Sequence, residues 1–95
     1  MIIRGLLPIG SVVLLKDSVN KLMIAGVYQF QQTDTSKLWQ YVGVLYPQGF
    51  LDPDSMYLFN ADQIDRVYML GYQDEEHFAF IDEVTRAIEE LKQQN

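Results

Sequence analysis

The residue types that could support catalysis or metal binding are few in this chain. His77 is the single histidine of the sequence, and a metal site there would pair it with Asp74, one helical turn earlier. No second histidine or convergent carboxylate completes such a site. We therefore interpret the run from Asp74 to His77 as the acidic start of a helix that carries a surface histidine.

The other chemically suggestive patterns also have structural explanations. Asp52 and Asp54 lie on either side of Pro53, but a calcium loop needs more ligands, and a turn accounts for both residues. Ser11 follows Gly10 without the Gly-x-Ser-x-Gly pattern of a serine nucleophile. The chain has no cysteine, which excludes thiolate catalysis, disulfides and iron–sulfur clusters. We expect no enzyme activity, no catalytic residues, no metal and no cofactor.

Composition excludes further classes of partner. The 95 residues suffice for a single domain, 1–95, and the 48% apolar and 21% charged fractions are typical of a soluble globular chain. The 13 acidic and 7 basic residues give a net charge of −6, which disfavours nucleic acid and anionic membranes as partners. No apolar run approaches about 18 residues, and Arg4 and Gly5 interrupt the apolar N-terminus. We expect a cytoplasmic protein that makes no membrane contact.

Hydrophobic patterning predicts a strand-rich region over 8–71, followed by a C-terminal helix over 74–93. The expected strands are 11–16, 21–30, 37–46, 56–59 and 66–70, separated by turn-forming segments. Gly26 inside the second strand indicates a bulge, a bend or a close backbone approach. Asn60 and Gln63 have the spacing of a capping box around a single helical turn.

The predicted helix has one apolar stripe and most of the negative charge. The stripe has helical spacing and consists of Phe78, Ile81, Val84, Ile88 and Leu91. From Asp74 onward the chain carries seven acidic and two basic residues, so five of its six net negative charges belong to this segment. A solvated helix face is the ordinary explanation, and electrostatic steering of a basic partner is the alternative.

The strands are apolar on both sides. In the third strand, strict alternation places Trp39 and Tyr41 on one face and Val42 and Val44 on the other, and neither face is clearly polar. A sheet with one solvated face would alternate in polarity. We therefore expect an α+β fold with a strongly curved antiparallel sheet of about five strands, which could form a small open barrel, and one C-terminal amphipathic helix. One helix covers one face, so the other needs curling or a second chain.

The aromatic residues suggest a partner-binding face as well as a core. A base-stacking platform would need accompanying basic residues, which are sparse along the strands. Exposed tyrosine and tryptophan are favoured in protein interfaces. The candidate partner-binding residues are Tyr28, Trp39, Tyr41 and Phe50, and core packing is the alternative role for the same side chains.

Two sequence strings resemble a family of small uncharacterised proteins from Gram-positive bacteria. The first is the run Leu7-Pro8-Ile9-Gly10-Ser11-Val12-Val13-Leu14-Leu15-Lys16, followed by Lys21-Leu22-Met23-Ile24. The second is Tyr41-Val42-Gly43-Val44-Leu45-Tyr46-Pro47-x-Gly49. Phe59-Asn60, Ile64, Gly71-Tyr72, Glu75-Glu76 and Phe78 are similar to its later positions, so the resemblance covers roughly Leu7 to Phe78. The family-motif residues are Pro8, Gly10, Ser11, Gly43, Tyr46, Pro47 and Gly49.

The resemblance implies a function that composition does not. Members of that family are encoded beside type VII secretion genes and LXG-domain toxins, and some are thought to act as cytosolic targeting chaperones. The resemblance therefore implies that this chain is a non-enzymatic adaptor that binds an LXG-type toxin together with small helical partner proteins. Two alternatives remain at this point: a homo-oligomeric, for example homodimeric, structural or regulatory domain, and an immunity protein against a toxin domain.

Overall fold

The computed structural model describes residues 5–31 and 34–93 and contains a five-stranded antiparallel sheet with one C-terminal α-helix. The strands are β1 (Val12–Leu15), β2 (Lys21–Gln31), β3 (Asp34–Leu45), β4 (Tyr57–Phe59) and β5 (Ile64–Met69). Two short 3₁₀ turns, η1 (Pro53–Ser55) and η2 (Ala61–Gln63), flank β4, and α1 spans Glu75–Gln93. The predicted α+β class is confirmed, and each predicted strand overlaps an observed one.

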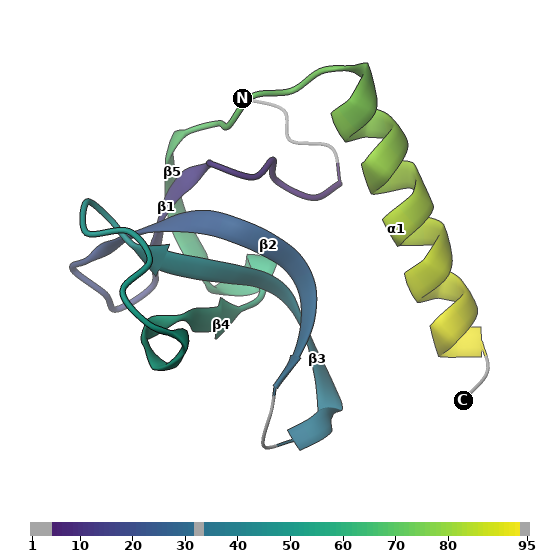
Figure 1. Cartoon of the computed structure of the whole chain (residues 1–95), viewed down its shortest axis with the longest axis horizontal. Helices are drawn as coiled ribbons and strands as arrows, with labels where there is room; N and C mark the ends of the chain where they lie inside the picture. Colours follow the sequence, from purple (N-terminus) through teal and green to yellow (C-terminus); the bar gives the residue numbers. More distant parts are fainter. Residues whose placement is uncertain (1–4, 32–33, 94–95) are drawn as a thin grey trace.

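The strand order forces the sheet to curl. The order is β4-β3-β2-β1-β5, so β4 and β5 lie at opposite edges, yet only Asn60 and η2 separate them in sequence. The two edges must therefore approach each other at this end. Within the described residues they do not pair, and the sheet stays open. Figure 1 shows β2 and β3 as two long strands that bend together around the core.

The η2 turn is held in place from both sides. The Asn60 backbone N–H donates to Gln63 Oε1 over 2.8 Å, as the capping-box spacing predicts. Gln40 of β3 fixes the turn to the sheet: its N–H donates to Asn60 Oδ1 over 3.1 Å, and its Oε1 accepts from the Ala61 N–H over 2.6 Å. These bonds anchor the connection between the two sheet edges to a central strand.

The bend in β2 has a local backbone cause. The register with β3 shifts between Ile24 and Gly26, so the strand is irregular at the glycine for which we expected a bulge, a bend or a close backbone approach. A Cβ at Gly26 would lie 2.8 Å from Val42 Cγ1, so only glycine allows this approach. Two residues later, Tyr28 has a φ of 49°, a left-handed conformation that is uncommon for a bulky residue. Together these two positions turn the strand around the core.

The core fills the inner face of the curled sheet. Register pairs Val13 of β1 with Leu22 of β2 and Val67 of β5, so these side chains share that face. The buried cluster consists of Leu6, Leu7, Val13, Leu22, Ile24, Tyr41, Phe59 and Ile81. Leu6 and Leu7 precede β1 and Ile81 belongs to α1, so segments from both ends of the chain complete the core.

The helix lies at one side of the sheet and is held along a narrow stripe (Figure 1). Ile81 is its one buried residue, and Val84 packs against the same core. The ends of the predicted apolar stripe are not covered, because Phe78 is 53% exposed and Leu91 is 40% exposed. Helix and sheet diverge, so the sheet covers only part of the apolar surface of α1.

Candidate functional site

The first family-motif segment forms a structural junction. The hydroxyl of Ser11 is fully buried and accepts a hydrogen bond from the Gly71 N–H over 3.0 Å. A Cβ on Gly71 would collide with the carbonyl group of Ile9, so glycine is required for this close approach. Gly10 contributes an N–H that donates to the Ile24 carbonyl over 2.8 Å. The motif thus joins the start of β1 to the segment after β5.

The second motif segment is structural as well. Gly43 allows Phe59 to pack across β3, because an added Cβ would lie 3.0 Å from Phe59 Cε1. The Tyr46–Pro47 peptide bond is cis, and the Gly49 N–H donates to the Leu45 carbonyl over 2.7 Å to close the turn. These motif residues therefore have a structural role in the scaffold.

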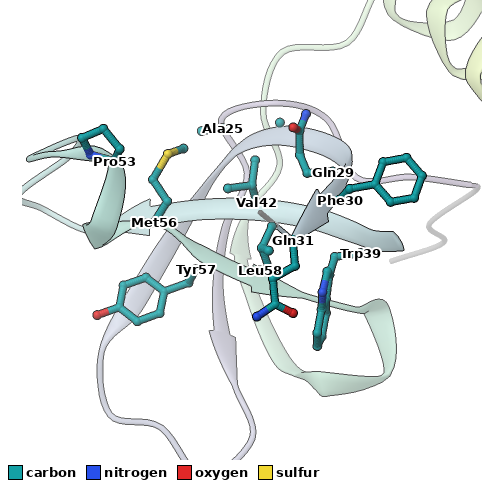
Figure 2. A pocket seen from close by; sticks show the side chains of 11 residues that line it. Ala25, Gln29, Phe30, Gln31, Trp39, Val42, Pro53, Met56, Tyr57 and Leu58 are labelled. Atoms are coloured by element: carbon teal, nitrogen blue, oxygen red, sulfur yellow. The ribbon is translucent and has the colours of Figure 1, made fainter. Parts of the chain in front are cut away.

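A groove on the outer side of the sheet contains Trp39. It has a volume of about 690 Å³ and is formed by β2, β3, β4 and η1. Trp39 and Phe30 lie at one end and Met56 and Pro53 at the other, with Val42 on the floor (Figure 2). The remaining lining residues are Ala25, Gly26, Gln29, Gln31, Tyr57 and Leu58. No lining residue is charged, but Gln29 and Gln31 contribute amide groups, so the groove suits an uncharged segment that offers both apolar side chains and backbone polar groups.

The indole N–H of Trp39 lacks a hydrogen-bond partner. Its Nε1 atom is buried and bonds to no described residue. A buried donor without an acceptor costs about 1–3 kcal/mol, and tryptophan usually finds a partner for this group. A carbonyl oxygen from a bound chain would satisfy it only if the ring turned to bring Nε1 to the groove surface.

Tyr41 belongs to the core and is not available at the surface. It is 2% exposed and stacks on Phe59 with ring centroids 5.5 Å apart. Its hydroxyl oxygen accepts a hydrogen bond from the Leu7 N–H over 3.0 Å. Burial raises the pKa of Tyr41 above 10.0; the Leu7 hydrogen bond opposes this shift and neighbouring Tyr28 adds to it. Its role is to tie the N-terminal segment to β3.

The other two candidates lie apart from Trp39. Tyr28 is half-buried and lines a second cleft, of about 470 Å³, between the sheet and the C-terminal half of α1, together with Leu38 and Ile88. Phe50 is 62% exposed in the loop after β3 and lines neither space. The structure thus places the four predicted residues in four environments, and Trp39 alone lies in the groove.

Strict strand alternation put Trp39 and Tyr41 on one face, and this prediction is wrong. Trp39 shares the outer groove with Val42, whereas Tyr41 points into the core. Tyr41 pairs with Val27 and Trp39 pairs with Gln29, on either side of the left-handed Tyr28 of β2. The strong bend of the sheet at this point carries Trp39 away from the core that Tyr41 enters.

A further apolar row on the outer face did not emerge from the sequence. Register places Met69, Val12, Met23 and Val44 side by side across four strands. Val12 and Val44 are buried, while Met69 is 55% exposed at the β5 edge. Flexible methionine side chains are common on protein-binding surfaces. The sequence signal for this apolar row was the two-residue alternation that methionine and valine follow along the strands.

Two aspartates that the sequence offered as candidate metal ligands serve as helix caps. Asp74 Oδ1 accepts a hydrogen bond from the His77 N–H over 3.0 Å, which caps α1. Asp52 Oδ1 accepts from the Asp54 N–H over 2.8 Å, which caps η1. No group of metal-binding side chains forms among residues 5–31 and 34–93. None of the described helices has the length and apolar character needed to cross a membrane.

Fold and site together define a small α+β domain with an open curled sheet and an uncharged aromatic groove on its outer face. A family model described as a domain of unknown function, DUF4176, matches residues 6–80, and the chain belongs to this family. The match begins at Leu6 in the core and ends in the first part of α1. Neither the curated proteins nor the solved structures gave a match.

Proposed function

We propose that this domain is a non-enzymatic adaptor that binds an LXG-type toxin in the cytoplasm and directs it to type VII secretion. The observation that carries the binding role is the outer groove, in which an unsatisfied indole N–H lies among uncharged side chains. The class of partner comes from the family resemblance of the sequence strings around Ser11 and Gly43. The motif residues hold the scaffold, and the groove holds the partner.

The chemistry of the groove favours an uncharged partner segment that offers apolar side chains and backbone carbonyls. Trp39, Phe30 and Tyr57 provide aromatic surface, and Phe30 and Tyr57 are about half exposed without a partner. Aromatic side chains in a desolvated pocket dominate the binding energy of many interfaces. A partner carbonyl at Trp39 would remove the cost of its unsatisfied donor.

Co-expression with the LXG-type protein encoded next to this gene tests the proposal. We expect a complex that persists through size-exclusion chromatography, with a change in the emission of Trp39, the single tryptophan of the chain. Phe30→Ala should weaken the complex about tenfold or more. Tyr72→Ala removes an aromatic ring that is 80% exposed outside the groove, and it should leave affinity unchanged.

The same experiment separates the alternatives. Elution of the two proteins in separate peaks would refute the adaptor role. Binding to the catalytic fragment of the toxin, instead of its LXG region, would identify an immunity protein. A stable dimer with no affinity for the toxin would identify a homo-oligomeric domain, for which the open β5 edge with exposed Met69 is the observation in favour.

A further inference from the structure

Helix α1 carries a second apolar seam beside the stripe that touches the core. Phe80, Val84, Ala87 and Leu91 follow one another at spacings of four, three and four residues. This is the spacing of the a and d positions of a heptad, in which one helix packs along another. Phe80 is 46% exposed, Leu91 is 40% exposed and Ala87 is also exposed, so the seam reaches the surface.

The fold leaves one side of this seam accessible. With Val84 at position a, Ile81 and Ile88 occupy the e positions on one flank. Ile81 is buried in the core and Ile88 lines the cleft toward β3, so the sheet occupies that flank. Figure 1 shows the sheet on one side of α1 only. A second helix must therefore approach from the opposite flank, where the g positions lie.

Glutamate occupies every g position of α1. Glu76, Glu83 and Glu90 are seven residues apart and all are exposed. Seven residues of helix rise about 10.5 Å, so the three carboxylates form a row along the seam. Within residues 5–31 and 34–93, none of the three forms an ion pair. The row thus presents unpaired negative charge beside an apolar strip.

We propose that this face of α1 docks an amphipathic helix of a partner protein that carries lysine or arginine beside its own apolar seam. Basic residues facing the g row would pair with the glutamates, while apolar residues enter the seam at Phe80 and Ala87. A second copy of this chain fits poorly, because an antiparallel pair would place glutamate against glutamate. In a parallel pair, the g positions of one helix face the e positions of the other, and the sheet already occupies the e flank of α1.

This inference goes beyond the groove, because it concerns another element and another chemistry. The groove is uncharged and lies over β2, β3 and β4, whereas the seam is acidic and lies on α1. Either surface can fail its test while the other passes.

A pair of synthetic peptides tests the seam on the full chain. Both peptides contain three heptads with leucine at a and d, and they carry either lysine or glutamate at e and g. Binding is measured by fluorescence anisotropy of the labelled peptide. We expect the lysine peptide to bind, more weakly as salt is raised, and the glutamate peptide to bind at least about tenfold more weakly.

Charge reversal provides the specificity control. The triple variant E76K/E83K/E90K should exchange its preference and bind the glutamate peptide. The triple variant E75K/D82K/E89K changes net charge by the same amount at exposed positions that face away from the seam. This variant should still prefer the lysine peptide, as the wild type does. Its changed net charge should only shift the affinity for all charged ligands by a small amount.

Two phenylalanine substitutions test the apolar part of the seam. Phe80→Ala should weaken binding of the lysine peptide about tenfold, whereas Phe78→Ala, on the far flank of the helix and 53% exposed, should not. Equal binding of both peptides, absence of binding, or an unchanged preference after reversal at the g positions would overturn the proposal. Self-association of the chain through these residues, seen by light scattering, would overturn it in favour of a homodimer.

Discussion

At the scale of single residues, the junction between Ser11 and Gly71 links two distant parts of the chain. One buried hydroxyl and one absent Cβ hold the segment before β1 against the segment after β5. Both features belong to one contact, so their effects on stability are coupled.

We predict that Ser11→Ala lowers the free energy of unfolding by about 1–3 kcal/mol, because the buried Gly71 N–H loses its acceptor. Gly71→Ala should cost about 2–4 kcal/mol, because the added methyl group meets the Ile9 carbonyl. In the double variant the two losses should not add, because each breaks the same contact. Urea unfolding measures all three variants, and strictly additive losses would contradict a shared junction.

Tyr41 gives the protein a stability that depends on pH. Because burial raises its pKa above 10.0, the folded protein keeps the phenol proton to higher pH than the unfolded chain does. The stabilisation is therefore complete below the ordinary pKa and is lost as the pH rises through the raised value.

We predict that Tyr41→Phe lowers the free energy of unfolding by about 1–2 kcal/mol at neutral pH, because the Leu7 N–H is left without an acceptor. Above pH 10.0, the gap between wild type and variant should narrow, because only the wild type loses the phenol contribution. Denaturant unfolding across this range, with Tyr57→Phe at a half-exposed tyrosine as control, measures the difference. A gap that widens with pH would refute this role for Tyr41.

The residue scale also shows where sequence reasoning failed. Tyr41 lies in the core and Trp39 lines the outer groove, close to the bend at Gly26 and Tyr28 of the paired strand β2. Gly26 signalled an irregularity, but nothing in the sequence indicated that Tyr28 adopts a left-handed backbone. A period-two pattern alone therefore could not identify the groove.

At the scale of elements, α1 is the least firmly held part of the described structure. Its contribution to the core is Ile81, supported by Val84, while β2 and β3 pair along most of their length. Elements with few buried contacts open at lower free energy than the rest of a domain.

We predict that the amides of α1 exchange with solvent faster than those of β2 and β3 in native-state hydrogen exchange. Ile81→Ala should lower the free energy of unfolding by about 2–4 kcal/mol and accelerate exchange in α1 most. Phe78→Ala, at a 53% exposed site whose ring contacts His77, is the control and should lower stability by about 1 kcal/mol, less than Ile81→Ala does. Equal protection of helix and sheet would contradict a weakly docked helix.

The sequence predicted where the elements begin and end better than it predicted how they pack, because the boundaries depend on local chemistry. Asp74 caps α1 and Asn60 with Gln63 caps η2, as their spacing predicts. The fifth strand begins at Ile64, two residues before the predicted start, because η2 ends directly at the strand. The buried stripe of α1 is narrower than predicted, because helical spacing identifies an apolar face without showing how much of it a neighbour covers.

At the scale of the whole molecule, the sheet cannot hide both of its apolar faces. The inner face is filled by the core and by α1, and the outer face is only partly covered. Strand content and the lack of a polar face indicated this imbalance from sequence. The order of strands was not predictable in the same way, because it depends on which edges meet after curling. The open edges, the groove and the acidic seam are three distinct features of the surface that the core leaves uncovered.

The burial of Leu6 and Leu7 against Ile81 also determines when the protein can fold during synthesis. Leu6 and Leu7 leave the ribosome long before the helix that carries Ile81 has been synthesised. A nascent chain that stops before residue 81 therefore exposes an unfinished core, and such intermediates are prone to aggregate. The core is complete only when the part of α1 that carries Ile81 has emerged, so synthesis of most of the described chain precedes the native state.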